Sequence, residues 1–425
     1  MEQQNQDWLK LDNAAKIYPA SSSTKSPAQF RLSVTLTSPV KFDILQKAWE
    51  SMIKRCPYFQ VYLRRGFFWY YLQRHQNIPP IELLDPVPVS IFQLKRKTTH
   101  LIRIGVRENT IALDFSHIIT DGNGGMRFML ALIYEYLRLT GSKIEKLKEI
   151  PYPDEEPSPE EFEDAHRKFF PGNLPQPESL SSAFHISGKP LANNNFNLIS
   201  GKLPLDKFLN LARKNQVSTT EYLTALYIFS LMEISRQESS KNNLRKSVIR
   251  MQVPVNMRKF HSSQTMRNFS LYVSPEIDLK LGKFSFEEIL KKVYHSMQIQ
   301  IDSKELGRQV SRNVGGELNP FVRAVPLFLK NLYMADLYRR LGEKCYSGVL
   351  SNLGPIAIPD TAKQFIKAFD VMIVPNHGMK KSCAVLSFGN ELLINFCSVV
   401  ESRELERLFF TKLVESGIPV SVREV

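Results

Sequence analysis

Apolar residues recur along the chain at two spacings, which predict a mixture of strands and amphipathic helices. Residues 42–54 place apolar side chains at the spacing of one helical face, and Pro57 follows as a stop signal. A second helix is predicted from about residue 123 to Gly141. Around these helices, apolar runs predict strands at 30–36, 58–63, 67–72, 89–95, 100–107 and 110–116.

The second half of the chain mixes the same two patterns. Helices are predicted over 205–213, from Ser218 or Thr219 to 232, and over 284–303, 318–338 and 402–414. Strands are predicted over 196–203, 248–255, 270–278, 345–351, 369–375, 383–389 and 391–399. The elements do not alternate strictly as strand, helix, strand. We therefore expect an α/β fold with largely antiparallel or mixed sheets.

A stretch rich in proline and acidic residues divides the chain roughly in half. Residues 151–185 open with Pro-Tyr-Pro-Asp-Glu-Glu-Pro and contain several further prolines. We expect an N-terminal subdomain over 1–150, a linker over 151–185 and a C-terminal subdomain over 186–425, because 425 residues are enough for two cores. Residues 1–20 are expected to form an extended lead-in, and the serine-rich residues 21–27 a loop.

Composition narrows the class of protein. Hydrophobic residues make up 43% of the chain, which indicates a globular protein with a large core. The four cysteines include no Cys-x-x-Cys pair, and the histidines show no metal-ligand spacing, so we expect neither a disulfide framework nor a metal site. No apolar run reaches about 18 residues. The polar, acidic N-terminus differs from a secretory signal peptide, so we expect a cytoplasmic protein without a transmembrane helix.

The formal charge of +14 is large and leaves several partners open. A nucleic acid, an anionic membrane surface or a phosphorylated small molecule would each complement it. The basic clusters are short and lie far apart in sequence, and no nucleic-acid module surrounds them. A solvated basic surface is the simplest interpretation, and no nucleic-acid partner is expected.

The stretch Asp114-Phe115-Ser116-His117-Ile118-Ile119-Thr120-Asp121-Gly122 carries the strongest candidate chemistry. His117 follows a predicted buried strand, Asp121 lies four residues on, and Gly122 can supply the positive φ or the close backbone approach that such a turn needs. The pKa of histidine lies near neutrality, so His117 could act as a general base, with the carboxylate fixing its loop or its tautomer. A structural histidine beside a strand has the same pattern, and spacing alone leaves both interpretations open.

The pattern His117-x-x-x-Asp121-Gly122 resembles the signature of the CoA-dependent acyltransferase superfamily. This superfamily includes chloramphenicol acetyltransferase, plant acyltransferases, peptide-synthetase condensation domains and bacterial alcohol acetyltransferase-like proteins. Three further segments resemble its members in the expected order, and the resemblance is strongest to the bacterial alcohol acetyltransferase-like and condensation-domain-like proteins. These segments are Trp-Leu-Lys-Leu-Asp-Asn-Ala-Ala-Lys-Ile-Tyr-Pro at 8–19, Pro-Val-Asn-Met-Arg at 254–258 and Ser-Asn-Leu-Gly at 351–354.

The resemblance implies a fold and a reaction. The fold is a pseudo-dimer of two chloramphenicol-acetyltransferase-like α/β sandwiches with a tunnel between them, so a monomer is expected. The reaction moves an acyl group, acetyl or short, from acyl-CoA to a hydroxyl or amine of a small molecule. No acyl-enzyme forms and no cofactor is held permanently. The resemblance makes His117 the general base.

The resemblance also assigns supporting residues. Asp121 turns away from the substrate and pairs with Arg258, and with Gly122 this pair holds the His117 loop in shape. The resemblance marks Ser351, Asn352 and Asn256 as candidates for the tunnel wall or an oxyanion contact. For the serine and its neighbour, a purely structural turn is an equal alternative.

Two departures from the superfamily and three rival functions bear on specificity. Ser116 stands where condensation domains carry a second histidine, which argues against peptide-bond formation. The plant Asp-Phe-Gly-Trp-Gly motif has only a partial counterpart at 387–390.

The alternative functions are three. The donor could be an acyl carrier protein, the protein could be a non-catalytic binding protein of the same fold, or it could bind a nucleic acid or an anionic surface, which is the weakest alternative.

Overall fold

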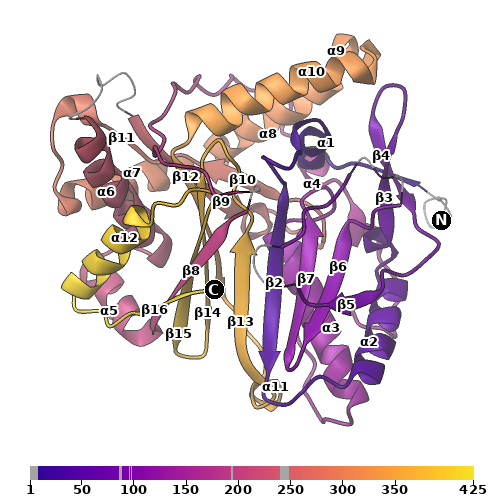
Figure 1. Cartoon of the computed structure of the whole chain (residues 1–425). Helices are drawn as coiled ribbons and strands as arrows, with labels where there is room; N and C mark the ends of the chain where they lie inside the picture. The colour runs from indigo at the N-terminus through magenta and orange to yellow at the C-terminus, as the bar shows by residue number, and fades with distance from the viewer. Residues whose placement is uncertain (1–7, 86–88, 95, 97, 193–194, 240–247) are drawn as a thin grey trace.

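Two large β-sheets stand side by side in the computed structural model, which describes residues 8–85, 89–94, 96, 98–192, 195–239 and 248–425 (Figure 1). The predicted α/β class with mixed sheets is confirmed. No helix within these residues is both long and apolar enough to cross a membrane.

The first sheet has five strands in the order β13-β2-β7-β6-β5 and is antiparallel except for the β5–β6 pair. Helices α2 (Phe42–Arg55) and α3 (Gly122–Leu139) pack against it, and their apolar faces join the strands in one core. The strands are β2 (Gln29–Leu36), β5 (Ile81–Leu83), β6 (Ile102–Arg107), β7 (Thr110–Ser116) and β13 (Ile366–Ile373).

The second sheet follows the order β10-β9-β12-β14-β15-β8-β16, with β11 added beside β9. Strand β12 runs parallel to both of its neighbours. The helices that cover this sheet are α5 (Leu205–Lys214), α6 (Thr219–Ser239), α7 (Phe286–Gln300) and α12 (Glu404–Glu415). The strands are β8 (Asn197–Pro204), β9 (Val248–Asn256), β10 (Ser270–Val273), β11 (Glu276–Asp278), β12 (Gly348–Pro355), β14 (Lys381–Phe388), β15 (Glu391–Ser398) and β16 (Ser421–Glu424).

Strand β13 connects the two halves of the chain. It comes late in the sequence, yet it pairs antiparallel with β2 and forms an edge of the first sheet. Its backbone also accepts hydrogen bonds from the second sheet, because Asn395 Nδ2 donates to Val371 O at 2.7 Å and Ser382 Oγ donates to Ile373 O at 2.7 Å. The division of the chain at 151–185 stays a prediction, but the first sheet is completed by residues beyond it.

The segment predicted as a linker contains folded structure. It includes a 3₁₀ turn (Pro159–Phe162) and α4 (Ala165–Lys168). Glu161 is buried and makes a paired contact with Arg55 of α2, with Nη2 2.7 Å from Oε1 and Nη1 2.9 Å from Oε2. The lead-in is folded as well, with β1 (Trp8–Lys10), a 3₁₀ turn (Ala14–Ile17) and α1 (Tyr18–Ser21). Residues 1–7 lie outside the described part.

Several predicted elements are wrong in detail. A strand was predicted over 89–95, but residues 89–94 form none, and residue 95 lies outside the described residues. The backbone there pairs with the Gln29 side chain instead, whose amide accepts from Phe92 N at 3.0 Å and donates to Ser90 O at 3.2 Å. The strand predicted over 270–278 is interrupted at Pro275, which has no N–H to donate. The predicted hairpin of 58–63 and 67–72 lies later, as β3 (Val61–Arg65) and β4 (Tyr70–Arg74).

The helical region after α7 differs most from the prediction. Helix α8 (Ser303–Leu318) was not predicted, and the single helix expected over 318–338 is two, α9 (Pro320–Ala324) and α10 (Leu327–Leu337). Pro320 and Pro326 explain the breaks, because proline cannot donate the hydrogen bond that would continue a helix across it and is favoured at the start of a new one.

Candidate active site

His117 lies immediately after β7, and backbone contacts on both sides fix its position. Its N–H donates to Ala28 O at 2.8 Å, and its carbonyl accepts from Asn268 Nδ2 at 2.9 Å. Two aromatic rings flank the imidazole: the ring centroids of Phe30 and Tyr18 lie 4.8 Å and 5.6 Å from its own. The ring is half-buried and held in a defined orientation.

The surroundings keep the imidazole of His117 neutral at pH 7. Burial lowers its pKa from 6.5 to about 4, because the charged form loses hydration, while Asp121 and a hydrogen bond with the backbone of Thr120 act in the opposite direction. A neutral imidazole has a lone pair that can accept a proton, which is the state that a general base requires.

Asp121 begins helix α3 and points into a set of donors rather than toward solvent. Its Oδ1 accepts from Gly124 N at 2.9 Å, which caps the helix. Its Oδ2 accepts from Phe269 N at 2.8 Å and from Arg258 Nη1 at 2.9 Å. Burial alone would raise the pKa of Asp121, but the charge of Arg258 and these three hydrogen bonds hold it below its usual value.

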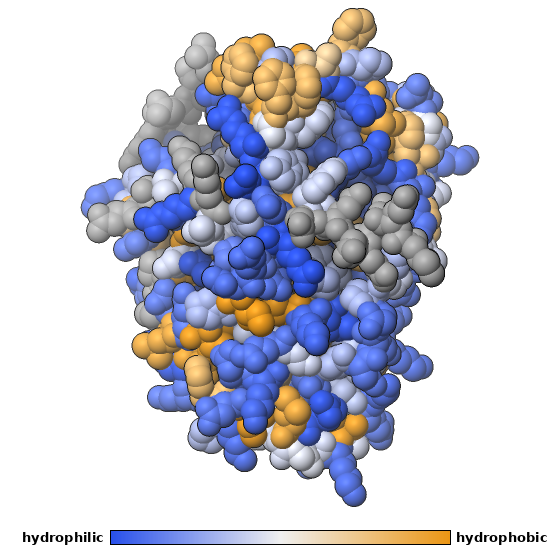
Figure 2. Space-filling view, turned by 90° about the vertical axis from the view of Figure 1, so that its right-hand side faces the viewer, coloured by the Kyte–Doolittle hydropathy of each residue, from blue (hydrophilic) through white to orange (hydrophobic). Residues whose placement is uncertain are grey.

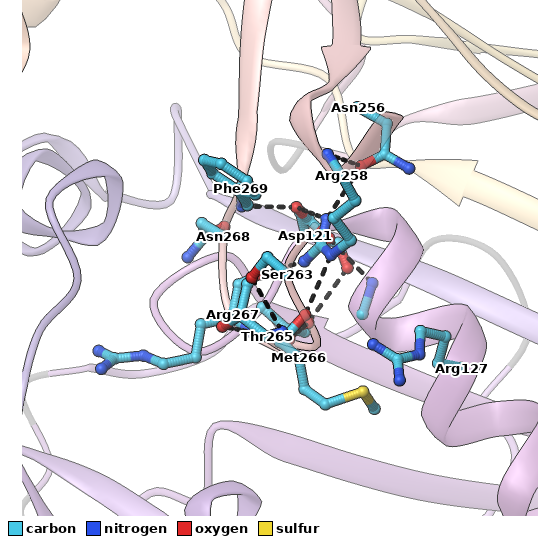
Figure 3. A network of polar contacts seen from close by, with 12 residues as sticks. Asp121, Arg127, Asn256, Arg258, Ser263, Thr265, Met266, Arg267, Asn268 and Phe269 are labelled. Carbon is cyan, nitrogen blue, oxygen red and sulfur yellow. Dashed lines mark hydrogen bonds and ion pairs between the residues drawn. The ribbon is translucent and has the colours of Figure 1, made fainter. Parts of the chain in front are cut away.

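Arg258 is the centre of this network (Figure 3). It follows β9 on a 3₁₀ turn (Met257–Lys259), and the side chain of Asn256 caps that turn by accepting from Arg258 N at 3.1 Å and Nη1 at 3.2 Å. The guanidinium also donates to Thr265 O at 3.0 Å and Arg267 O at 2.6 Å. Every guanidinium nitrogen has an acceptor, so Arg258 links Asp121 of the first half to a loop of the second.

That loop, residues 261–269, contacts the start of α3 directly. Thr120 Oγ1 donates to Met266 O at 2.6 Å, and Met266 N donates to Glu161 O at 2.6 Å. Gly124 allows this approach, because a Cβ there would overlap Met266 O and Thr120 Oγ1. The loop, the segment around Glu161 and the His117 turn are thus locked together.

The predicted residues Ser351 and Asn352 lie in the middle of β12. Both polar atoms of the Asn352 side chain have partners: its Nδ2 donates to Thr220 Oγ1 of α6 at 3.1 Å, and its Oδ1 accepts from Gly354 N at 2.8 Å. Ser351 is half-buried on the same strand. A Cβ on Gly122 would come within 2.8 Å of Leu353 Cδ2, so β12 packs against the His117 turn through Leu353. Oxyanion roles for Ser351, Asn352 and Asn256 stay predictions.

Asn268 and Tyr18 are among the residues at the site that were not predicted from the sequence. Asn268 joins the His117 carbonyl to Asp12, whose Oδ2 accepts from Asn268 Nδ2 at 3.1 Å. Tyr18 stacks on the imidazole and shares a hydrogen bond with Tyr272. Tyr18 belongs to the segment 8–19 that resembles the superfamily, but no periodicity places this tyrosine against His117. Within the described residues, no group of three or more His, Cys, Asp or Glu is placed to hold a metal ion.

Comparison with solved structures shows the class of fold. Polyketide synthase associated protein 5 from Mycobacterium tuberculosis matches with a TM-score of 0.60 and 11% identity over 95% of this chain and 96% of its own. The starter condensation domain of rhizomide synthetase, in complex with C8-CoA, matches with a TM-score of 0.61 and 11% identity over 96% and 95%. The chain therefore has the two-subdomain fold of condensation domains and chloramphenicol-acetyltransferase-like proteins.

A third structure with this fold holds coenzyme A. It is F. graminearum TRI101, complexed with coenzyme A and deoxynivalenol, with a TM-score of 0.59 and 10% identity over 97% of this chain and 99% of its own. No family model matches the sequence, and no curated protein matches it.

Proposed function

We propose that the protein is an acyltransferase that moves an acyl group from acyl-CoA to a hydroxyl or amine of a small molecule, with His117 as general base. The observation that carries this proposal is the neutral, half-buried imidazole of His117, fixed between Phe30 and Tyr18 on a turn clamped by Asp121 and Arg258. An alcohol O-acetyltransferase with an acetyl or short acyl donor is the form that the sequence resemblance favours.

In this reaction the acceptor oxygen or nitrogen attacks the thioester carbonyl while a ring nitrogen of His117 takes its proton. The tetrahedral intermediate then collapses, the carbon–sulfur bond breaks, and the imidazolium returns the proton to the departing thiolate. Donor and acceptor meet at one imidazole, so no acyl-enzyme is needed and positioning supplies much of the rate.

The neighbours of His117 have positioning roles in this proposal. Asp121 gives its Oδ2 to Arg258 and Phe269 and its Oδ1 to Gly124, so it holds the turn rather than relaying protons. Tyr18 covers one side of the imidazole and restricts the orientation of the ring. Both residues support the base without taking part in proton transfer.

The donor could be delivered in two forms, and the charge of the chain is relevant to both. CoA carries several phosphate charges, and acyl carrier proteins are acidic, so a chain of net charge +14 complements either. Free CoA as a competitor distinguishes them, because it blocks a CoA site but competes poorly with a donor docked through a carrier protein surface.

The test is thiol release from a panel of acyl-CoAs with pooled small alcohols and amines as acceptors. We expect acceptor-dependent release by the wild type and its loss in His117→Ala, since proton transfer by a positioned base contributes about 10²–10⁴-fold. His295→Ala is the matched control, because that histidine is exposed on α7 and should leave the rate unchanged. Equal rates in wild type and His117→Ala would refute the proposed role.

A further inference from the structure

A cluster of exposed apolar side chains lies at one end of the molecule. It comprises the outward faces of α9 and α10 and the turn between β3 and β4, and in Figure 2 hydrophobic residues gather at this end. Phe321 is 85% exposed and Leu332 is 71% exposed. We call this cluster the apical patch, and it comprises Phe67, Phe68, Phe321, Val322, Phe328, Leu329, Leu332 and Tyr333.

The apical patch is held in place by specific contacts beneath it. The backbone of α10 is tied to the hairpin turn, because Leu327 N donates to Phe67 O at 2.8 Å. Lys330 is buried, donates to Phe68 O at 3.0 Å and lies 3.8 Å from the centroid of the Trp69 ring. Helix α10 therefore has a packed inner face, and its apolar outer residues project from a fixed support.

The elements that carry these apolar side chains also carry exposed arginines. Arg65, Arg323, Arg339 and Arg340 are exposed on the same elements or immediately after them. The one carboxylate on α10 is Asp336, which pairs with Arg339 at 2.7 Å and Arg340 at 2.7 Å. The elements that carry the apical patch thus expose more cationic than anionic groups, in agreement with the net charge of the chain.

We propose that the apical patch binds the surface of an anionic lipid membrane. Aromatic and aliphatic side chains on a helix face enter the boundary between headgroups and acyl chains, while arginines beside them contact anionic headgroups. Soluble monomers rarely expose a contiguous apolar surface of this kind without a partner. A nucleic acid would complement the arginines but not the exposed aliphatic side chains of Val322, Leu329 and Leu332.

The position of the patch connects membrane attachment to the candidate site. Helix α10 packs against α1, and α1 carries Tyr18, which stacks on His117. Figure 1 shows α1 next to α10, so a single short helix links the helix that carries the apical patch to the residue stacked on the imidazole. Membrane binding itself does not depend on catalysis, and His117→Ala should bind vesicles as the wild type does.

The test is sedimentation of the whole chain with vesicles of phosphatidylcholine alone and of equal parts phosphatidylcholine and phosphatidylglycerol. We expect binding to the anionic vesicles that weakens with added salt. The double variant Phe321→Ser with Leu332→Ser should weaken binding by about tenfold or more, because both side chains lose their insertion into the interface. Because both side chains are exposed, their replacement should leave the protein folded, and a loss of vesicle binding would not result from unfolding.

The matched control is Leu281→Ser with Ile299→Ser, which are 73% and 68% exposed outside the patch and should bind as the wild type does. Arg65→Gln with Arg323→Gln should weaken binding to the anionic vesicles by roughly tenfold, whereas Lys207→Gln with Lys283→Gln should weaken it much less. Absence of vesicle binding, equal loss in both apolar variants, or self-association through the patch in place of vesicle binding would overturn the proposal.

Discussion

Replacing Asp121 by alanine should impair the protein mainly by loosening the turn that carries His117. The carboxylate is buried and accepts three hydrogen bonds, from Gly124 N, Phe269 N and Arg258 Nη1. Removing one partner of a buried ion pair costs about 3–5 kcal/mol, because the remaining charge is left buried. The loss of the helix cap, worth about 1 kcal/mol, overlaps with this cost.

The lower end of that range is the better expectation. Arg258 keeps Thr265 O, Arg267 O and Asn256 Oδ1 as acceptors after Asp121 is removed, so its hydrogen bonds are only partly lost. We therefore expect the free energy of unfolding to fall by about 3 kcal/mol in Asp121→Ala. Activity should fall with the folded fraction and with the order of the turn.

Urea unfolding followed by fluorescence measures the free energy of unfolding, and thiol release measures the activity. Asp154→Ala is the control, because this exposed carboxylate lies on the connecting segment and should leave both quantities unchanged. Asp121→Asn with Arg258→Met, compared with each single variant, should reveal a favourable coupling energy. An Asp121→Ala protein with wild-type stability and no chemical step would refute the positioning role and place the carboxylate in the reaction.

Two further predictions concern acid stability and the closeness of the loop to α3. Burial lowers the pKa of His117 from 6.5 to about 4, so between these two pH values His117 is protonated in the unfolded chain but not in the folded protein. The free energy of unfolding should therefore fall as the pH drops from about 6.5 toward about 4. In His117→Gln the free energy of unfolding should fall less over this pH range. Part of the dependence on pH should remain, because burial also lowers the pKa of His100 to about 4. An identical dependence of stability on pH in both proteins would contradict the assigned pKa of His117. Gly124→Ala should lower the free energy of unfolding by several kcal/mol, because its Cβ would overlap the backbone of Met266. Gly316→Ala, in open space on α8, should raise the free energy of unfolding by up to about 1 kcal/mol. Thermal unfolding of both variants measures this difference.

The sequence predicted the features that depend on near neighbours. The helix over 42–54 and the one ending near Gly141 were predicted because their apolar spacing is local, and both are confirmed within a residue or two. His117 and Asp121 could be selected together because they lie on one turn. Pro275, Pro320 and Pro326 were visible in the sequence, so the breaks at these prolines were predictable from proline chemistry.

Other features depend on contacts between distant residues. Asn268 and Tyr18 approach His117 across roughly 150 and 100 positions of sequence, and no local pattern marks either of them. The pairing of β13 with β2 is of the same kind, since an apolar strand does not show which sheet it will join. Strand β5 was missed because its three residues are too short to show a period.

Strand β13 delays completion of the first sheet while the protein is synthesised on the ribosome. The first sheet has its other four strands once residue 116 has emerged, but the β2 edge waits for residues 366–373. At about 5–20 residues per second, that edge stays open for more than ten seconds during synthesis. An open strand edge is a template for pairing with another chain, so aggregation of the nascent chain is the hazard that this topology creates. Chains truncated before residue 366 should be prone to the same aggregation.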